Sequence, residues 1–257
     1  PELAKKEYAK IASTLPKFSI QNATQDWKGK KRMLYDYTRK VLGKDADGGV
    51  QLTGDCTSWS ARNCINYLQC VQIASEGKSD EFKDVFPPYV YSCSRNLSGG
   101  GQLGSSQGSV GAWVQDSLKK YGTIFSDSEG CPKYSESIAN QWGNRSPSKN
   151  FLDIGSKYPV KTTALITNAE DCAAALYNGF PISVCSNFGF TFKSYNGFMQ
   201  PSGTWNHAMS ILGYHDSEKY GLFFWICNSW GDQFEHLLDL DDPSVSLPIG
   251  GLRVKGD

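Results

Sequence analysis

The stretch LFFWICNSW at residues 222–230 predicts a buried strand that ends in a polar turn. Its branched and aromatic side chains are those that fit a pleated sheet. Asn228 comes directly after the buried part, where its side chain can hydrogen-bond one ring nitrogen of a histidine and fix the tautomer without adding charge. Trp230 can cover that hydrogen bond and exclude water, which strengthens it. The alternative is a tight turn beside an aromatic core residue.

Three more strands are predicted in the C-terminal part of the chain, and all five predicted helices precede them. The strands are FPISVCSN at 180–187, HAMSILGYH at 207–215 and GGLRV at 250–254. The helices are predicted over residues 2–12, 29–42, 55–76, 110–121 and 169–178, from apolar residues at helical spacing and from residues that start or stop helices. Helices first and strands second is an α+β arrangement, which leaves room for a groove between two lobes.

The longest predicted helix contains neither Gly nor Pro and begins in the segment GDCTSW at 54–59. Asp55 can cap its start, which places Cys56 in the first turn, at the positive end of the helix dipole. That position lowers the thiol pKa and favours the nucleophilic thiolate. Gly54 lets the backbone approach a substrate closely, and the Cys56 amide can donate to a developing oxyanion. The alternative is a buried cysteine at a helix start, without chemistry.

One of the three histidines stands where a catalytic base is needed. His207 begins a predicted strand, so its ring can face a cleft while the strand behind it stays rigid. His215 and His236 lie in polar, loop-like surroundings and are expected at the surface. Because a single histidine at a strand start is more often structural, the three segments are informative only together.

The order of these residues resembles that of papain-like cysteine peptidases. Cys56 is followed by His207 after 151 residues and by Asn228 after a further 21. Four neighbouring segments resemble the family as well: NHA at 206–208 with the following strand to Gly213-Tyr214, NSWG at 228–231 after Trp225, NGFPISV at 178–184, and a Gly-rich loop at 98–111 before a helix. In the family that loop forms one wall of the substrate cleft. The resemblance covers about residues 48–256.

This resemblance implies a two-lobed papain-like fold with a catalytic triad. Cys56 would be the nucleophile, His207 its base and Asn228 the residue that orients the base. The implied reaction is hydrolysis of amide (peptide) bonds through a thioester acyl-enzyme. No metal and no organic cofactor is implied. The expected partner is a peptide or protein substrate in the groove between the lobes.

The oxyanion hole is implied to consist of the Cys56 amide and the Gln51 side chain, with Gly54 and Trp230 as supporting residues. The glutamine of the family stands six residues before the nucleophile, whereas Gln51 stands five before it, so the intervening loop must be tighter here. Thr53 occupies the place of a half-cystine of the family, and that disulfide is therefore absent.

An N-terminal helical extension is expected over 1–47 and a papain-like peptidase domain over 48–257, with a helical lobe at about 48–130 and a β-rich lobe at about 131–257. The extension does not resemble the usual inhibitory propeptide, and its helices are a candidate contact for an assembly partner. An acidic insertion, EHLLDLDDPSVSLP at 235–248, stands where the family has a shorter link. These departures favour a distant branch of microbial, phage or viral type.

The composition favours some binding partners and cellular compartments over others. Lys+Arg and Asp+Glu are both 26, and this balance argues against nucleic acid or an anionic membrane as the main partner. No apolar run approaches the roughly 18–20 residues that span a bilayer. The 8 cysteines form no CxxC pair, and free thiols are favoured over disulfides, which suits a reducing compartment such as the cytoplasm, or a virion. Four cysteines lie in apolar stretches and are expected to be buried: Cys64, Cys172, Cys185 and Cys227.

Two alternatives to the peptidase stay open. One is a peptidoglycan amidase or endopeptidase, because murein hydrolases also combine a helix-start cysteine with a downstream strand histidine. The other is a structural or virion-associated protein that keeps the papain fold with weak or no activity. The loosely matched segment around Cys56 supports the second alternative, whereas the retained order of cysteine, histidine and asparagine argues against it.

Overall fold

The computed structural model describes residues 2–18, 26–77 and 81–256, which form helices and an antiparallel sheet. The chain divides into two compact units. Unit 1 comprises Pro1–Lys17, Gln51–Arg62 and Lys83–Leu165, and unit 2 comprises Phe18–Val50, Asn63–Phe82 and Ile166–Asp257. The mixture of helices and antiparallel strands confirms the predicted α+β class. None of the helices in the described part combines the length and apolar character that a membrane span requires.

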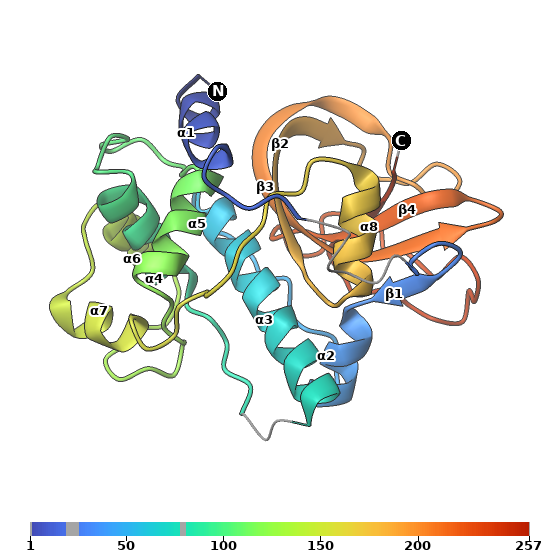
Figure 1. Ribbon diagram of the computed structural model, residues 1–257, viewed down its shortest axis with the longest axis horizontal. Helices are drawn as coiled ribbons and strands as arrows, with labels where there is room; N and C mark the ends of the chain where they lie inside the picture. The colour runs from blue at the N-terminus through green and yellow to red at the C-terminus, as the bar shows by residue number, and fades with distance from the viewer. Residues whose placement is uncertain (1, 19–25, 78–80, 257) are drawn as a thin grey trace. The chain divides into compact units, whose positions relative to one another are not determined.

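Unit 2 is built on a sheet that has five antiparallel strands within the described residues (Figure 1). They are β1 (Lys31–Met33), β2 (Ile182–Phe190), β3 (Pro201–Ser217), β4 (Gly221–Cys227) and β5 (Gly251–Lys255). Strand β3 pairs with β1, β2 and β4, and β4 pairs in turn with β5. Ser210 of β3 lies opposite Cys227 of β4, so the turn after β4 comes back toward the first half of β3.

Two helices of unit 2 pack on this sheet and bury its aromatic residues. Helix α2 (Tyr35–Leu42) places the Tyr35 ring edge-on against Trp225, with centroids 5.3 Å apart. Helix α8 (Ala169–Tyr177) lies against β3, as Figure 1 shows. Trp225 is only 1% exposed, and burying a side chain of this size contributes about 1.5–3 kcal/mol or more to folding. The core of unit 2 therefore lies directly behind the turn that follows β4.

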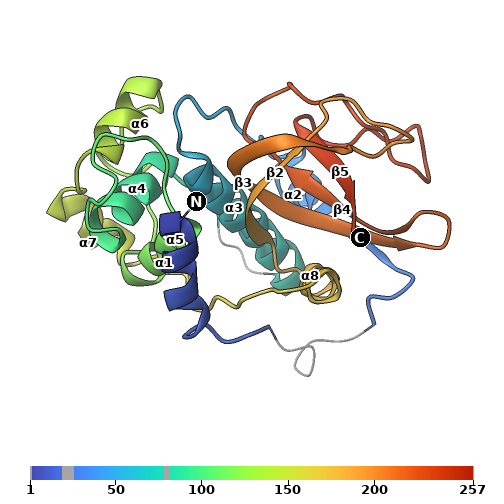
Figure 2. The same ribbon diagram turned by 90° about the horizontal axis from the view of Figure 1, so that it is seen from above.

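Unit 1 is helical. Its elements are α1 (Glu2–Ala12), α4 (Pro87–Ser92), the π-helix η2 (Cys93–Ser98), α5 (Gly111–Lys120), α6 (Glu136–Gly143) and α7 (Lys149–Gly155). Figure 2 shows α1 beside α5, where the Trp113 indole N–H donates to the Glu7 carboxylate at 3.0 Å. Trp142 of α6 packs against Phe86 and Phe151, with ring centroids 5.4 and 5.0 Å away.

Helix α3 (Cys56–Glu76) contributes residues to both units, as far as Arg62 to unit 1 and from Asn63 to unit 2. Its bounds confirm the helix predicted at 55–76. In unit 1 the Arg62 guanidinium binds both carboxylate oxygens of Asp84, at 2.8 and 3.0 Å. In unit 2 the Asn63 amide donates to the Gly48 carbonyl at 3.0 Å. Each part of the helix is thus anchored within its own unit.

The main error of the sequence analysis concerns residues 29–42, which are predicted as one helix. Lys31–Met33 instead form β1, which pairs with His215 to Gly213 of β3, and only α2 is helical. The Met33 side chain is buried in this arrangement, so tertiary pairing outweighs helical spacing. The short helices α4, α6 and α7 and the π-helix η2 are absent from the prediction, because segments of six to eight residues carry little periodicity.

The cysteines are also partly different from expectation. All eight lie in the described part of the chain and are thiols rather than halves of disulfides, as favoured by the sequence. Cys172 and Cys227 are buried as predicted, whereas Cys185 is exposed and Cys64 only partly buried. Strand β2 alternates between inward and outward side chains, and Cys185 takes an outward position.

The compact units do not follow the proposed domain bounds. The proposed extension, 1–47, is divided between them, because α1 belongs to unit 1 and β1 and α2 belong to unit 2. Residues 19–25 of that extension lie outside the described residues. Helices α6 and α7 belong to unit 1, although they follow residue 131. The domain bounds stay predictions.

Candidate active site

Unit 2 brings together His207 of β3 and Asn228, the residue after β4. The His207 ring nitrogen Nε2 lies 2.7 Å from the Asn228 side-chain oxygen Oδ1. His207 is 6% exposed and Asn228 2%, so this hydrogen bond is shielded from water. The pairing of β3 with β4 creates the contact between residues that are 21 apart in sequence.

The hydrogen bonds of Asn228 also determine which nitrogen of His207 carries the proton. The Ser229 amide donates to Asn228 Oδ1 at 2.8 Å, which identifies this atom as the oxygen of the amide. An amide oxygen only accepts, so His207 Nε2 must be the donor. The neutral ring therefore presents Nδ1 as its acceptor.

Aromatic rings enclose the imidazole of His207. The Trp230 ring stacks on it with centroids 4.3 Å apart and planes inclined by 28°. Trp205 in turn meets the Trp230 ring edge-on at 5.0 Å. Burial lowers the pKa of His207, and the hydrogen bond to Asn228 opposes this effect. Near neutral pH the ring is thereby poised to accept a proton.

The turn that carries Asn228 is held by backbone contacts on two sides. The Asn228 amide donates to the Gly250 carbonyl at 3.2 Å, and the Gly231 amide donates to the Gly49 carbonyl at 3.3 Å. A Cβ atom at Gly48 would lie only 2.8 Å from the Asn228 carbonyl oxygen and from Cys227 Sγ. The segment before α3 therefore approaches the turn closely enough to require glycine.

Unit 1 contains Cys56, the first residue of α3. Cys56 is partly buried, and the Asp55 carbonyl before it accepts the first helical hydrogen bonds, from the Ser58 and Trp59 amides at 2.9 and 3.2 Å. The amide of a residue in this first turn points out of the helix start, and the dipole there favours an anion. The Gly54 amide donates to Gln107 Oε1 at 3.2 Å, which connects the cysteine loop to the Gly-rich loop.

Gln51 lies in the loop that precedes Cys56, at the start of the second segment of unit 1. Its side-chain amide donates to the Thr53 carbonyl at 2.9 Å, so the side chain folds along the tight turn between them. The side-chain amide of Gln51 carries two hydrogens, one of which makes this bond.

Comparisons with known proteins identify the family of this chain. The family model described as "Papain family cysteine protease" matches residues 50–237, which is more than half of the chain. The chain belongs to the papain family of cysteine proteases. Membership makes it a papain-like cysteine peptidase, a hydrolase.

Solved structures of papain-like proteases share the fold of this chain. Xylellain, a cysteine protease from Xylella fastidiosa, is 15% identical with a TM-score of 0.60, over 95% of this chain and 85% of that one. Procathepsin B S9 from Trypanosoma congolense is 13% identical with a TM-score of 0.61, over 96% and 79%. Bromelain from Ananas comosus in complex with the E64 inhibitor is 14% identical with a TM-score of 0.52, over 88% and 89%. None of the curated proteins compared with the chain matches it.

The other two histidines lie apart from the pair in unit 2 of this papain-family chain. His215 Nδ1 is 3.3 Å from the Asp241 carboxylate, and His236 Nε2 is 3.0 Å from the Leu247 carbonyl oxygen. Among the described residues, no group of three or more His, Cys, Asp or Glu side chains is placed to hold a metal ion.

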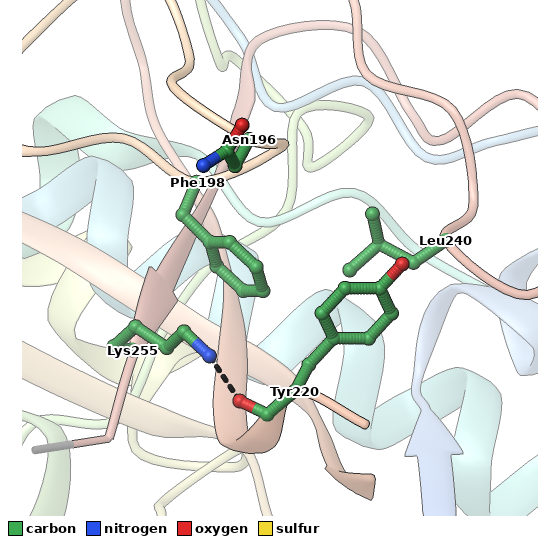
Figure 3. A pocket seen from close by; sticks show the side chains of 5 residues that line it. All are labelled: Asn196, Phe198, Tyr220, Leu240 and Lys255. Carbon is green, nitrogen blue, oxygen red and sulfur yellow. Dashed lines mark hydrogen bonds between the residues drawn. The ribbon is translucent and has the colours of Figure 1, made fainter.

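A separate hollow of about 630 Å³ lies on unit 2. Figure 3 shows Phe198, Tyr220, Leu240 and Lys255 around it, with the Lys255 ammonium bound to the Tyr220 carbonyl. Neither member of the His207–Asn228 pair lines this hollow.

Two residues that contact the predicted site residues are not predicted from the sequence. Trp205 adds a second indole beside Trp230, and its position two residues before His207 is the only sequence signal for it. In unit 1 the Tyr134 hydroxyl lies 3.1 Å from the Asp55 carboxylate. Because 79 residues separate the two, no local pattern could reveal that contact.

Proposed function

We propose that Cys56, His207 and Asn228 form the catalytic triad of a peptidase that hydrolyses peptide bonds through a thioester intermediate. The observation that supports this most strongly is the buried hydrogen bond from His207 Nε2 to Asn228, which leaves Nδ1 as the acceptor of the ring. A base needs a free acceptor nitrogen and a fixed orientation, and this pair has both. Cys56, at a helix start, is the thiol whose position favours the thiolate.

In the proposed reaction, His207 Nδ1 takes the proton of the Cys56 thiol, which gives a thiolate and an imidazolium. The thiolate attacks the carbonyl carbon of the scissile peptide bond, and the negative charge moves to the carbonyl oxygen. This intermediate collapses, the C–N bond breaks, and the imidazolium gives its proton to the leaving amine. Water then attacks the thioester, His207 accepts its proton, and the carboxylic acid product and the thiol are released.

The oxyanion of this reaction requires donors near Cys56. We assign this role to the Cys56 amide, which points out of the start of α3, and to the second amide hydrogen of Gln51. The substrate is a peptide or a protein. Trp230 supports the base, because its ring covers the imidazole and keeps water from the hydrogen bond to Asn228.

The test compares the parent protein with Cys56→Ala and with Cys185→Ala, a matched control that removes an exposed thiol. Turnover is measured on casein and on a library of fluorogenic peptides, together with labelling by an epoxide probe, since bromelain is known in complex with the E64 inhibitor. We expect Cys56→Ala to abolish turnover and labelling, and Cys185→Ala to retain both. Turnover that persists in Cys56→Ala would contradict the proposal. A parent that labels no cysteine and cleaves no substrate, murein included, would favour a scaffold instead.

A further inference from the structure

The residue immediately before the proposed nucleophile is a carboxylic acid that is entirely buried. Asp55 is 0% exposed, although Asp is almost never fully buried in proteins without a charged partner. Among the described residues no cation forms an ion pair with it. The Arg62 guanidinium binds Asp84, and the Arg95 guanidinium binds the Gly143 and Gly104 carbonyls at 2.7 and 2.8 Å. Asp55 is therefore a buried acid that has no cation as a partner among the described residues.

The hydrogen bonds of Tyr134 identify the role of each Asp55 oxygen. The Tyr134 hydroxyl oxygen accepts from the Leu52 amide at 2.9 Å and from the Trp59 indole N–H at 3.2 Å. With both acceptor sites used, its single proton must be donated to Asp55 Oδ2, 3.1 Å away. The other oxygen, Oδ1, is buried and has no hydrogen-bond partner in the described part of the chain. An orphan oxygen is costly for a carboxylate and less so for a neutral acid.

We propose that Asp55 is a positioning residue for the reaction, which permits the Cys56 thiolate while it is a neutral acid and opposes that thiolate when it becomes a carboxylate. This inference rests on the proposed function, in which Cys56 is the nucleophile. The charges would sit on consecutive residues at the start of α3, away from bulk water, where like charges repel more strongly than in solution. Ionisation of Asp55 releases its proton to water and leaves a carboxylate on the residue next to Cys56.

The environment supports a neutral acid near neutral pH. Burial raises the pKa of Asp55 to about 7, against the opposing effects of hydrogen bonds with Tyr134, with its own backbone amide and with Trp59. Among the described residues, the titratable groups near Asp55 are Tyr134, which donates to it, and Tyr91 of α4, and Cys56 is the next residue in the chain. Burial also raises the pKa of both tyrosines, so neither ionises in the range where Asp55 does. The proposal therefore treats Asp55 and the adjacent Cys56 thiol as a coupled pair.

The test measures the rate of iodoacetamide alkylation at Cys56 between pH 5 and 10, assigned by mass spectrometry. The substitution Asp55→Asn keeps the shape and an oxygen acceptor for Tyr134 but cannot ionise. In the parent, the alkylation rate of Cys56 should rise with pH over a broad range in two steps. In Asp55→Asn, the rate should follow a single one-proton curve with a midpoint at lower pH. At pH 7–8 the variant should react roughly tenfold faster, as expected for the removal of a nearby like charge. Both curves are repeated in a His207→Ala background, so that the imidazole does not contribute.

Two further variants keep the test decisive. Asp153→Asn makes the same change at an exposed ion pair with Lys149 in unit 1 and should follow the parent curve. Tyr134→Phe removes the donor to Oδ2, which should move the upper step of the parent curve to higher pH. This variant and the parent curve suffice if Asp55→Asn does not fold. A one-proton curve in the parent, or Asp55→Asn and parent curves that coincide, would overturn the proposal.

Alkylation needs no peptidase activity, so the outcome is independent of the test of the proposed function. If Cys56→Ala retained turnover while Asp55→Asn changed the alkylation curve, the proposed function would fail and the coupling would stand. The opposite pair of results would leave Cys56 as the nucleophile and remove Asp55 from its control.

Discussion

The two candidate groups differ in how their surroundings hold them. In unit 2 the His207–Asn228 pair combines a 2.7 Å hydrogen bond, a second donor to the same oxygen from Ser229 and a stacked indole, and it grows out of paired strands. In unit 1 Cys56 begins a helix directly after Asp55, a buried acid with one unsatisfied oxygen. The Asn228 side-chain nitrogen, like Asp55 Oδ1, is buried without a hydrogen-bond partner among the described residues. The orientation of the base is thus fixed by the contacts of the Asn228 oxygen and of Trp230, whereas the charge state of the nucleophile depends on the titration of its neighbour.

This difference indicates that unit 1, and not unit 2, loses stability at its candidate residues. The sheet of unit 2 gains stability from the aromatic core around Trp225 and positions Asn228 as a consequence. A buried acid without a cation reduces the stability of unit 1 as it ionises, because its hydrogen bonds offset only part of its desolvation. Residues that reduce stability and lie beside reactive groups are often functional.

The largest effect is expected from removing the base. His207→Ala should lower kcat/KM by roughly 10²–10⁴, the usual contribution of a general acid–base group. The matched control is His215→Ala, which removes a histidine of the same strand that lies by Asp241. It should change kcat/KM little. Equal losses in the two variants, with unchanged melting temperatures, would indicate that His207 has no special role.

The next largest effect is expected from Gln51→Ala, which tests the proposed oxyanion donor in unit 1. If its second amide hydrogen reaches the oxyanion, Gln51→Ala should lower kcat by roughly 10²–10³, or about 2.7–4 kcal/mol of transition-state stabilisation. Its bond to the Thr53 carbonyl lies in a surface loop, so the free energy of unfolding should change little. Peptide turnover and urea unfolding measure the two quantities. Unchanged turnover would mean that another donor serves the oxyanion.

Asp55→Asn is expected to have a smaller effect, on the pH dependence of the free energy of unfolding. The folded pKa of Asp55 is raised to about 7 from an ordinary value of 3.8, so the native state holds the proton more tightly than the unfolded chain. The contribution of Asp55 is fully present below about pH 4 and is lost as pH rises to about 7. Three pKa units correspond to at most about 4 kcal/mol.

Urea unfolding at pH 4 and pH 8 measures this contribution. Between these values the stability of the parent should fall by up to about 4 kcal/mol more than that of Asp55→Asn. Asp153→Asn, at an exposed site, should follow the parent. A parent and an Asp55→Asn variant with the same pH dependence would show that folding does not raise the pKa of Asp55.

The contrast between the units also explains what the sequence could predict. Cys56, His207 and Asn228 stand in short segments with strong local signals: a helix without breakers, and strands rich in branched and aromatic residues. The order of these three residues resembles that of the papain family, and the match of the family model confirms the membership. The fold class and the long helix α3 follow from the same periodicity.

Contacts between residues that are far apart in the chain could not be predicted from the sequence. Residues 31–33 have helical spacing but pair with β3, and Tyr134 meets Asp55 across 79 positions. The protonation of Asp55 could not be predicted either, because it depends on burial by side chains from several segments. The sequence identifies Asp55 only as a helix cap, a role that Asp commonly has in exposed helix starts.

The most direct test of the central claim is whether His207 activates Cys56. The measurement is the alkylation rate of all eight thiols at pH 6 in the parent, in His207→Ala and in His215→Ala. We expect Cys56 to be the most reactive thiol of the parent, since burial raises the pKa of Cys70, Cys93, Cys131 and Cys172 to about 11–12. His207→Ala should slow Cys56 by at least roughly tenfold, while His215→Ala should not. A rate at Cys56 that is the same in all three proteins would contradict the account.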